Sequence, residues 1–159
     1  MIALIFVFTI VGICTTHFMT AKQDDGSIVN ARNLLVSCAS FMGGPLIGIP
    51  TTVFVTAERF AMGGPTAVPC CIATLMAGII SSLLYRFAGN KFPPVIISTL
   101  YMLAMETIHL FLIGIMYDGY QFGGAATEIL GSALGMFLCT YIYFREVERR
   151  RGKGEIPWI

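Results

Sequence analysis

Apolar residues run through this sequence in long stretches, which short polar or glycine-containing segments separate. The first stretch covers residues 2–19 and is about long enough to cross the hydrocarbon core of a bilayer. Further stretches predict helices over Ala67–Tyr85, over Pro93–Met116 and over Ala126–Phe144. Proline is tolerated in the first turn of a helix, which suits a start at Pro93. The pattern therefore predicts a set of membrane-embedded helices.

The remaining apolar stretch lies between Arg32 and Arg59 and is interrupted only by Gly43-Gly44-Pro45. One continuous helix over Asn33–Glu58 would be about 39 Å long and would carry the two arginines to opposite membrane faces. A reversal at the Gly-Gly-Pro would instead give two arms of about 15–18 Å and return both arginines to the same face. We favour the reversal, because glycine weakens a helix and proline removes a backbone donor.

Composition supports the membrane interpretation. The 159 residues are 56% hydrophobic and only 12% charged, whereas a soluble domain carries about twice that charged fraction. We expect an all-α, polytopic helical membrane bundle of five to six segments, with a break or reversal near 43–45. Residues 1–145 form the expected membrane domain and residues 146–159 a cytoplasmic basic tail. The net charge of +1 does not indicate nucleic acid as a partner, and no cofactor is indicated.

Basic residues predict the orientation. The tail Arg145–Ile159 holds five of them, so the positive-inside rule places it in the cytoplasm. Counting back through the helices, the loop Arg86–Phe92 is also cytoplasmic and the loop Arg59–Thr66 lies outside. No cleavable signal peptide is apparent, so residues 2–19 are interpreted as a membrane helix. With a reversal in the central stretch, both termini lie inside.

The two central arginines have two interpretations. Both could snorkel to lipid headgroups, with Arg59 neutralised by the adjacent Glu58 or by lipid phosphate. Alternatively, Arg32 and Arg59 could form an anion pocket, because a guanidinium group binds a carboxylate through two hydrogen bonds. The sequence alone leaves both interpretations open.

Three further residues are candidates for lining such a pocket. Asn30 would supply an amide, and Cys70 and Thr74 lie at the start of the helix that follows Gly63-Gly64-Pro65. Backbone N–H groups at a helix N-terminus could face the same anion. The expected ligand-binding residues are therefore Asn30, Arg32, Arg59, Cys70 and Thr74.

Glu106 and His109 lie three residues apart on one predicted helix and so share a face. They form either an internally hydrogen-bonded pair, a proton-linked coupling site or a counter-ion for an arginine. Glu128 is expected at the membrane interface. The five cysteines show no metal-ligand spacing and are interpreted as small apolar residues in helix packing. No metal site and no catalytic constellation is expected, so this chain is not expected to be an enzyme itself.

The central stretch and its neighbours resemble a known family, the LytS-type five-transmembrane sensor domain (5TM-LYT). The ordered motifs that carry the resemblance are Asn30-Ala31-Arg32, Gly43-Gly44-Pro45-Leu46-Ile47-Gly48, Glu58-Arg59-Phe60-Ala61-Met62-Gly63-Gly64 and Ala73-Thr74-Leu75-Met76-Ala77-Gly78. A proline-led helix with a later acidic residue, and a charged helix leaving the membrane, also resemble the family. The family typically has N-T-R-D where this chain has Asn30-Ala31-Arg32-Asn33.

The resemblance implies a multi-pass sensor or receptor domain in a bacterial plasma membrane. Such domains precede output modules in sensor histidine kinases or diguanylate cyclases, so the parent protein would act in signal transduction and cell-wall organisation. The implied partners are a small organic anion, such as a pyruvate-like carboxylate, the lipid bilayer and a second copy through the output linker. The alternative is a substrate-binding membrane component of a small-molecule uptake transporter, and a third is a purely structural membrane protein.

Overall fold

The computed structural model describes residues 2–18, 21–22, 28–29, 31–85, 93–118 and 125–153. This part of the chain is helical apart from turns and one pair of two-residue antiparallel strands, β1 (Ala21–Lys22) and β2 (Ile28–Val29). The helices are α1 (Ile2–Phe18), α2 (Arg32–Gly43), α3 (Pro45–Met62), α4 (Ala67–Leu84), α5 (Pro94–Met116) and α6 (Ala125–Gly152). The expected all-α helical bundle is confirmed.

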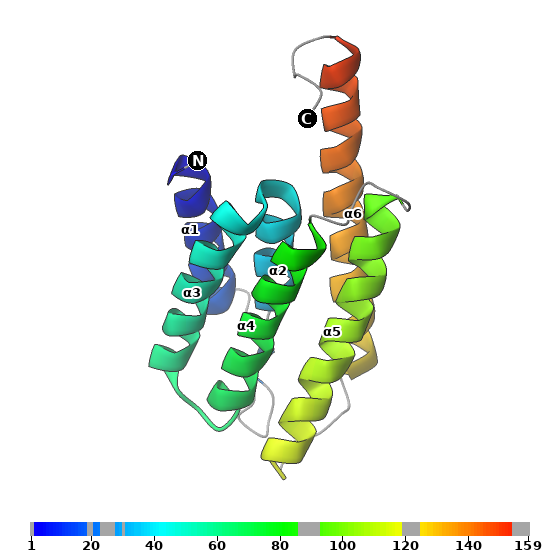
Figure 1. Cartoon of the computed structure of the whole chain (residues 1–159). Helices are drawn as coiled ribbons and strands as arrows, with labels where there is room; N and C mark the ends of the chain where they lie inside the picture. The colour runs from blue at the N-terminus through cyan, green and yellow to red at the C-terminus, as the bar shows by residue number, and fades with distance from the viewer. Residues whose placement is uncertain are drawn as a thin grey trace.

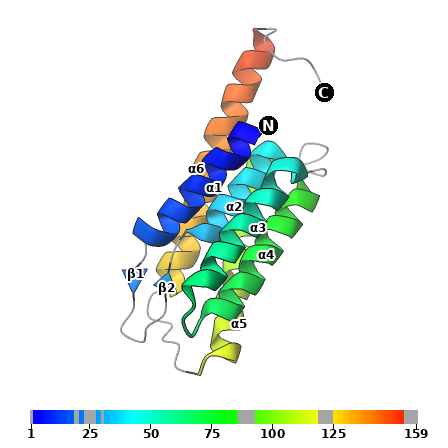
Figure 2. The ribbon, with the colours of Figure 1, turned by 90° about the vertical axis from the view of Figure 1, so that its left-hand side faces the viewer.

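The helices alternate in direction along the chain (Figure 1). The start of α1, the junction between α2 and α3 and the end of α4 lie at one end of the bundle, which is also the end toward which α6 leads. The last part of α6 projects beyond the other helices at this end (Figure 2). The opposite end of the bundle holds the start of α2, the end of α3 and the start of α4. Arg32 and Arg59 therefore lie at the same end of the bundle, away from the projecting part of α6.

The reversal between α2 and α3 takes place at Gly44, as the Gly-Gly-Pro sequence predicts. Gly44 has a φ of +67°, a backbone conformation that residues other than glycine rarely adopt. Its N–H donates to the carbonyl of Ser40, and Pro45 occupies the first turn of α3, where it needs no donor. Two separate helices packed antiparallel result, so the prediction of a reversal is confirmed and the single long helix is excluded.

Small residues allow α2, α3 and α4 to approach closely. A Cβ atom added to Gly48 of α3 would lie 2.7 Å from the Cα of Ser40 in α2. A Cβ added to Gly78 of α4 would similarly overlap the side chain of Thr52. The Ser40 hydroxyl donates to the Gly78 carbonyl at 3.3 Å, and Ser82 donates to the Ser40 hydroxyl at 3.2 Å. Close backbone approach and polar contacts between helices are typical of membrane bundles.

A main apolar core lies where α2 and α4 meet α5 and α6. The ring centroids of Phe41 and Tyr101 are 5.7 Å apart, and the Tyr101 hydroxyl donates to the carbonyl of Ala77. Fully buried residues from the facing helices surround these rings. The cluster comprises Val36, Cys38, Phe41, Val55, Ala77, Tyr101, Met102, Met105 and Met136. This core fixes the positions of the helices that carry the polar residues described below.

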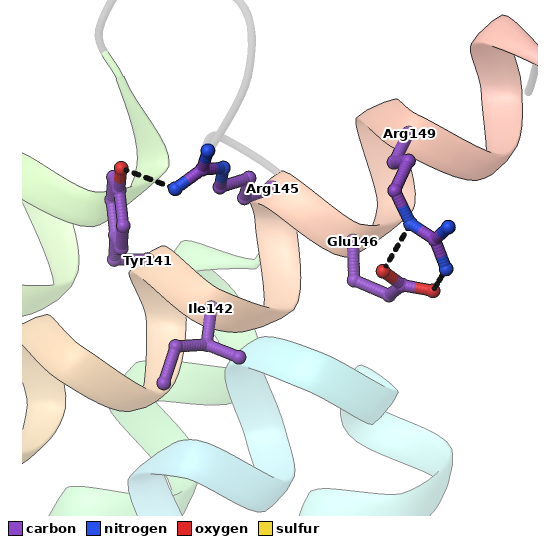
Figure 3. A pocket seen from close by; sticks show the side chains of 5 residues that line it. All are labelled: Tyr141, Ile142, Arg145, Glu146 and Arg149. Carbon is purple, nitrogen blue, oxygen red and sulfur yellow. Dashed lines mark hydrogen bonds and ion pairs between the residues drawn. The ribbon is translucent and has the colours of Figure 1, made fainter.

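Three of the described helices are long and apolar enough to cross a membrane: α4, α5 and the segment Ala125–Arg150 of α6. The last helix does not stop at Phe144, where its apolar part ends, but continues to Gly152. This agrees with the charged helix leaving the membrane that the family resemblance implied. Glu146 accepts a hydrogen bond from Arg149 at 2.7 Å (Figure 3). It accepts another from Arg150 at 2.8 Å, and both bonds support this extension.

One predicted boundary was wrong: Arg59 was expected to begin an outer loop. Helix α3 instead continues to Met62, and the connection to α4 starts at Gly63 and Gly64, whose φ angles of +68° and +95° end the helix. The predicted loop at residues 86–92 and the candidate ligand residue Asn30 lie outside the described residues.

Candidate functional site

Arg32 and Arg59 are both enclosed by the protein. Arg32 is the first residue of α2 and Arg59 lies in the last turn of α3, and their exposed fractions are 2% and 0%. The two guanidinium groups lie close enough to act on each other electrostatically. The reversal at Gly44 thus brings together two cations that a continuous helix would have kept apart. Because both groups are buried among the helices, neither snorkels from the protein surface.

Arg59 has a structural task as well. Its guanidinium donates to the carbonyl of Gly63 and, at 3.2 Å, to the hydroxyl of Thr66. These bonds hold the turn that leads from α3 into α4. Among the described residues, the Nε atom of Arg59 has no hydrogen-bond partner. One donor of a fully buried cation is therefore left over after the turn has been secured.

Glu58 does not neutralise Arg59, contrary to one of the two expectations. The Glu58 carboxylate lies 2.9 Å from Nε2 of His17, on α1. Neighbouring residues on a helix point about 100° apart, so Glu58 faces α1 while Arg59 faces the bundle interior. Among the described residues, no carboxylate forms an ion pair with Arg59.

The first turns of α4 bring Cys70 and Thr74 to the same region. Cys70 is fully buried and lies within electrostatic range of Arg32 and Arg59. The Thr74 hydroxyl donates to the Asn33 side-chain oxygen at 3.0 Å and to the carbonyl of Cys70 at 2.8 Å. The structure therefore groups four of the five predicted ligand residues at one end of the bundle, and the fifth, Asn30, is outside the described residues.

Glu106 and His109 of α5 form the predicted internal pair. The His109 Nδ1 atom lies 2.9 Å from a Glu106 carboxylate oxygen, and both side chains are buried. The side-chain amide of Asn33 approaches the same oxygen at 3.4 Å. On the other side of the ring, Nε2 of His109 lies 3.4 Å from the sulfur of Cys70. The pair is thereby connected through Cys70 to the region of Arg32.

Glu128 belongs to the same cluster, which the sequence did not predict. Its carboxylate, only 8% exposed, lies 3.9 Å from Nδ1 of His109. Helix α6 begins at Ala125, so its first turn packs beside the last turns of α5 and buries Glu128. One ligand atom from each of Glu106, His109 and Glu128 lies within 4.8 Å of the other two.

Sequence reasoning missed two members of this cluster, Asn33 and Glu128. Asn33 is 2% exposed and bonds to Thr74 and Glu106, so it joins α2 to α4 and α5. In the sequence, Asn33 could have been selected because its amide follows Arg32 directly at the start of an apolar stretch. Glu128 carried the signal of any carboxylate inside a membrane helix, namely that it needs a partner.

Together these side chains make a polar cluster inside an otherwise apolar bundle, built from α2, α3, α4, α5 and α6. It offers guanidinium, amide, hydroxyl and thiol donors on one side and two carboxylates beside an imidazole on the other. Hydrogen bonds from charged donors are the stronger kind, and buried ones are stronger still than those in water. The structure therefore defines a polytopic helical membrane domain with a buried, charged cluster at one end.

Comparison with known proteins identifies the family. The family model 5TM-5TMR_LYT, described as the 5TMR of 5TMR-LYT, matches residues 1–147. The chain belongs to this family, as its ordered motifs suggested. No solved structure matches the chain.

Curated relatives carry the names of sensor proteins. The chain is 31% identical over 108 residues to sensor protein LytS of Bacillus subtilis (strain 168), covering 67% of this chain and 18% of that protein. It is 41% identical over 59 residues to sensor histidine kinase YpdA of Escherichia coli (strain K12), covering 36% and 10%. It is 33% identical over 79 residues to sensor histidine kinase BtsS of the same organism, covering 50% and 14%. The chain thus spans less than a fifth of the length of these relatives.

Proposed function

We propose that this chain is the membrane sensor domain of a bacterial signalling protein of the histidine kinase type, and that it binds a small carboxylate between Arg32 and Arg59. The family membership and the names of its relatives support the sensor role. The observation that supports a carboxylate ligand is the burial of two neighbouring guanidinium groups, one of which keeps an unused donor. Like charges buried side by side repel, so an anion between them would relieve that repulsion.

The expected ligand is small and carries one carboxylate, as pyruvate does. Asn33 and Thr74 are already bonded to each other, so the donors that face a ligand are chiefly the guanidinium groups and the thiol of Cys70. Asn30 precedes Arg32 by two residues and is proposed to add an amide. In this proposal Glu106 and His109 couple the occupied site to α5 and α6.

The signal would leave the membrane through α6. This helix carries Glu128 in the cluster at its start and continues to Gly152 beyond the other helices (Figure 2). A shift at Glu128 would therefore move a rigid helix that leads toward the proposed output module. We place the C-terminus in the cytoplasm, where the parent protein would carry a kinase module, and expect a second copy to pair along this linker.

Thermal unfolding with added ligand tests the binding site. A ligand at about 100 times its dissociation constant stabilises the folded protein by about 2.7 kcal/mol, which corresponds to a shift of about 5–11 °C for a chain of this size. We expect pyruvate, or another member of a panel of small carboxylates, to give such a shift with the wild-type protein in lipid nanodiscs. Arg32→Ala and Arg59→Ala should abolish the shift.

Two control variants separate binding from folding. Thr66→Val removes a structural bond of Arg59 without removing its charge, and should lower the melting temperature while keeping the ligand-induced shift. Arg145→Ala removes an exposed arginine of α6 and should behave as wild type. If carboxylates stabilise both arginine variants as much as the wild-type protein, the proposed site is wrong.

A further inference from the structure

The carboxylates of Glu106 and Glu128 both face a single imidazole nitrogen. Nδ1 of His109 is 2.9 Å from Glu106 and 3.9 Å from Glu128. All three groups are buried, with side-chain exposures of 1%, 5% and 8% for Glu106, His109 and Glu128. A ring nitrogen carries at most one hydrogen, so it serves one carboxylate well and leaves the other facing a like charge.

Proton sharing would resolve this arrangement. Two ionised carboxylates placed this close in a low-dielectric interior oppose each other strongly, and one added proton removes the opposition. The amide of Asn33 approaches Glu106 and cannot relieve Glu128, because the amide carries no net charge. The geometry of the three groups is therefore that of a proton-binding site.

The number of protons bound by Glu106, His109 and Glu128 depends on the charge at the neighbouring arginines. Formally, the two cations Arg32 and Arg59 balance the two anions Glu106 and Glu128. A carboxylate bound between the arginines adds one negative charge to these four side chains. Burying an uncompensated charge is costly, and a proton taken up by the cluster restores the balance.

One residue, Cys70, connects the arginines to His109 and the carboxylates. Nε2 of His109 contacts the Cys70 sulfur at 3.4 Å, and Cys70 interacts electrostatically with both arginines. Glu128 is likewise within electrostatic range of Arg32. A change of charge at the arginines is therefore felt by the carboxylates with little screening.

Titratable and charged groups face this cluster from five helices. Tyr101 also lies within electrostatic range of Glu106, and its hydroxyl is occupied by the Ala77 carbonyl. The charged and titratable groups of the cluster are Arg32 of α2, Arg59 of α3, Cys70 of α4, Glu106 and His109 of α5, and Glu128 of α6.

We propose that a proton is the co-ligand of this sensor: the Glu106–His109–Glu128 cluster takes up one proton from solvent when a carboxylate binds beside Arg32 and Arg59. This inference rests on the proposed carboxylate site and adds a second ligand to it. The coupling free energy between two ligands is reciprocal. Protonation of the cluster would therefore strengthen carboxylate binding by the same factor by which a bound carboxylate strengthens proton binding. The domain would then report the anion and the external acidity together.

Titration calorimetry in lipid nanodiscs tests the proposal. Pyruvate is titrated into the wild-type protein at one pH in buffers that differ in ionisation enthalpy, and the dependence of the heat on the buffer gives the number of protons taken up. We expect a value near one. Correspondingly, the dissociation constant should rise up to roughly tenfold for each unit by which the pH is raised, because one proton is linked to binding.

Two matched variants assign the proton to the cluster. Glu128→Gln keeps the shape of the side chain and removes its charge, so pyruvate should still bind while proton uptake falls toward zero. Glu148→Gln makes the same change at an exposed position of the same helix and should take up a proton as wild type does. Equal proton uptake by Glu128→Gln and wild type would overturn the assignment.

The outcomes separate the two proposals. Pyruvate binding by the wild-type protein with no buffer dependence and no pH dependence overturns the proton proposal and leaves the carboxylate site standing. Absence of binding for every carboxylate of the panel overturns the carboxylate site and the coupling with it. If Glu128→Gln does not fold, the wild-type buffer series alone still decides whether a proton is taken up.

Discussion

Replacing Gly48 by alanine should destabilise the protein, because α2 and α3 pack against each other at this position. The added Cβ would lie 2.7 Å from the Cα of Ser40, and a backbone atom cannot move aside as the end of a flexible side chain can. The helices must separate or the backbone must shift, which typically costs about 1–3 kcal/mol. The clash is with backbone, so shortening the Ser40 side chain would not remove it.

Gly131→Ala supplies the matched comparison. Gly131 also lies inside a helix, but a Cβ added there meets no atom within 4 Å. Both substitutions gain the same helix preference of about 1 kcal/mol for alanine over glycine, so this gain cancels between them. The difference in unfolding free energy between the two variants should therefore equal the packing cost, about 1–3 kcal/mol, with Gly48→Ala the less stable.

Thermal unfolding in the same nanodisc preparation measures this difference. A change of 1 kcal/mol shifts the melting temperature of a chain of this size by about 2–4 °C. Equal melting temperatures for Gly48→Ala and Gly131→Ala would refute the close approach of α2 and α3 at Ser40.

Two further expectations follow from the buried contacts and the exposed tail. Asn33→Ala removes the amide that reaches Thr74 and Glu106. It should lower the unfolding free energy by about 1–3 kcal/mol, because a buried acceptor loses its partner. A melting temperature equal to that of Gly131→Ala would contradict this expectation. Trypsin added to inside-out membrane vesicles should cut the exposed part of α6 at Arg149, while buried Arg32 stays intact. In right-side-out vesicles both sites should be protected. Cleavage at Arg149 in right-side-out vesicles but not in inside-out vesicles would refute the cytoplasmic C-terminus.

Local chemistry explains which parts of the fold the sequence could predict. The reversal at Gly44 needs a residue that tolerates positive φ, followed by one that needs no donor, and only Gly-Gly-Pro in the central stretch offers both. The start of α5 at Pro94 follows from the same rule for the first helical turn. Polar residues alone do not end a helix, so α6 continues past the apolar stretch that ends at Phe144. Glu146 and Arg149 instead stabilise it on an exposed face.

The polar cluster was predictable in part. Arg32, Arg59 and the pair of Glu106 and His109 could be selected because charged groups inside apolar stretches need partners. Which partners they have depends on packing between helices distant in sequence, and the spacing of residues along one helix does not contain that information. Glu128 shows this clearly: its distance from the helix start suggests an interface position, but its burial depends on where α5 ends.

The shortness of α2 sets how deep Arg32 would lie in a bilayer. With 12 residues, this helix rises about 18 Å from the junction at Gly44 to Arg32, whereas a hydrocarbon core is about 30 Å thick. With the junction at one membrane interface, the start of α2 would lie about 12 Å below the other, inside the bilayer. In the proposed carboxylate site, an anion would then have to exchange part of its hydration shell for the guanidinium donors, which would favour small, singly charged ligands.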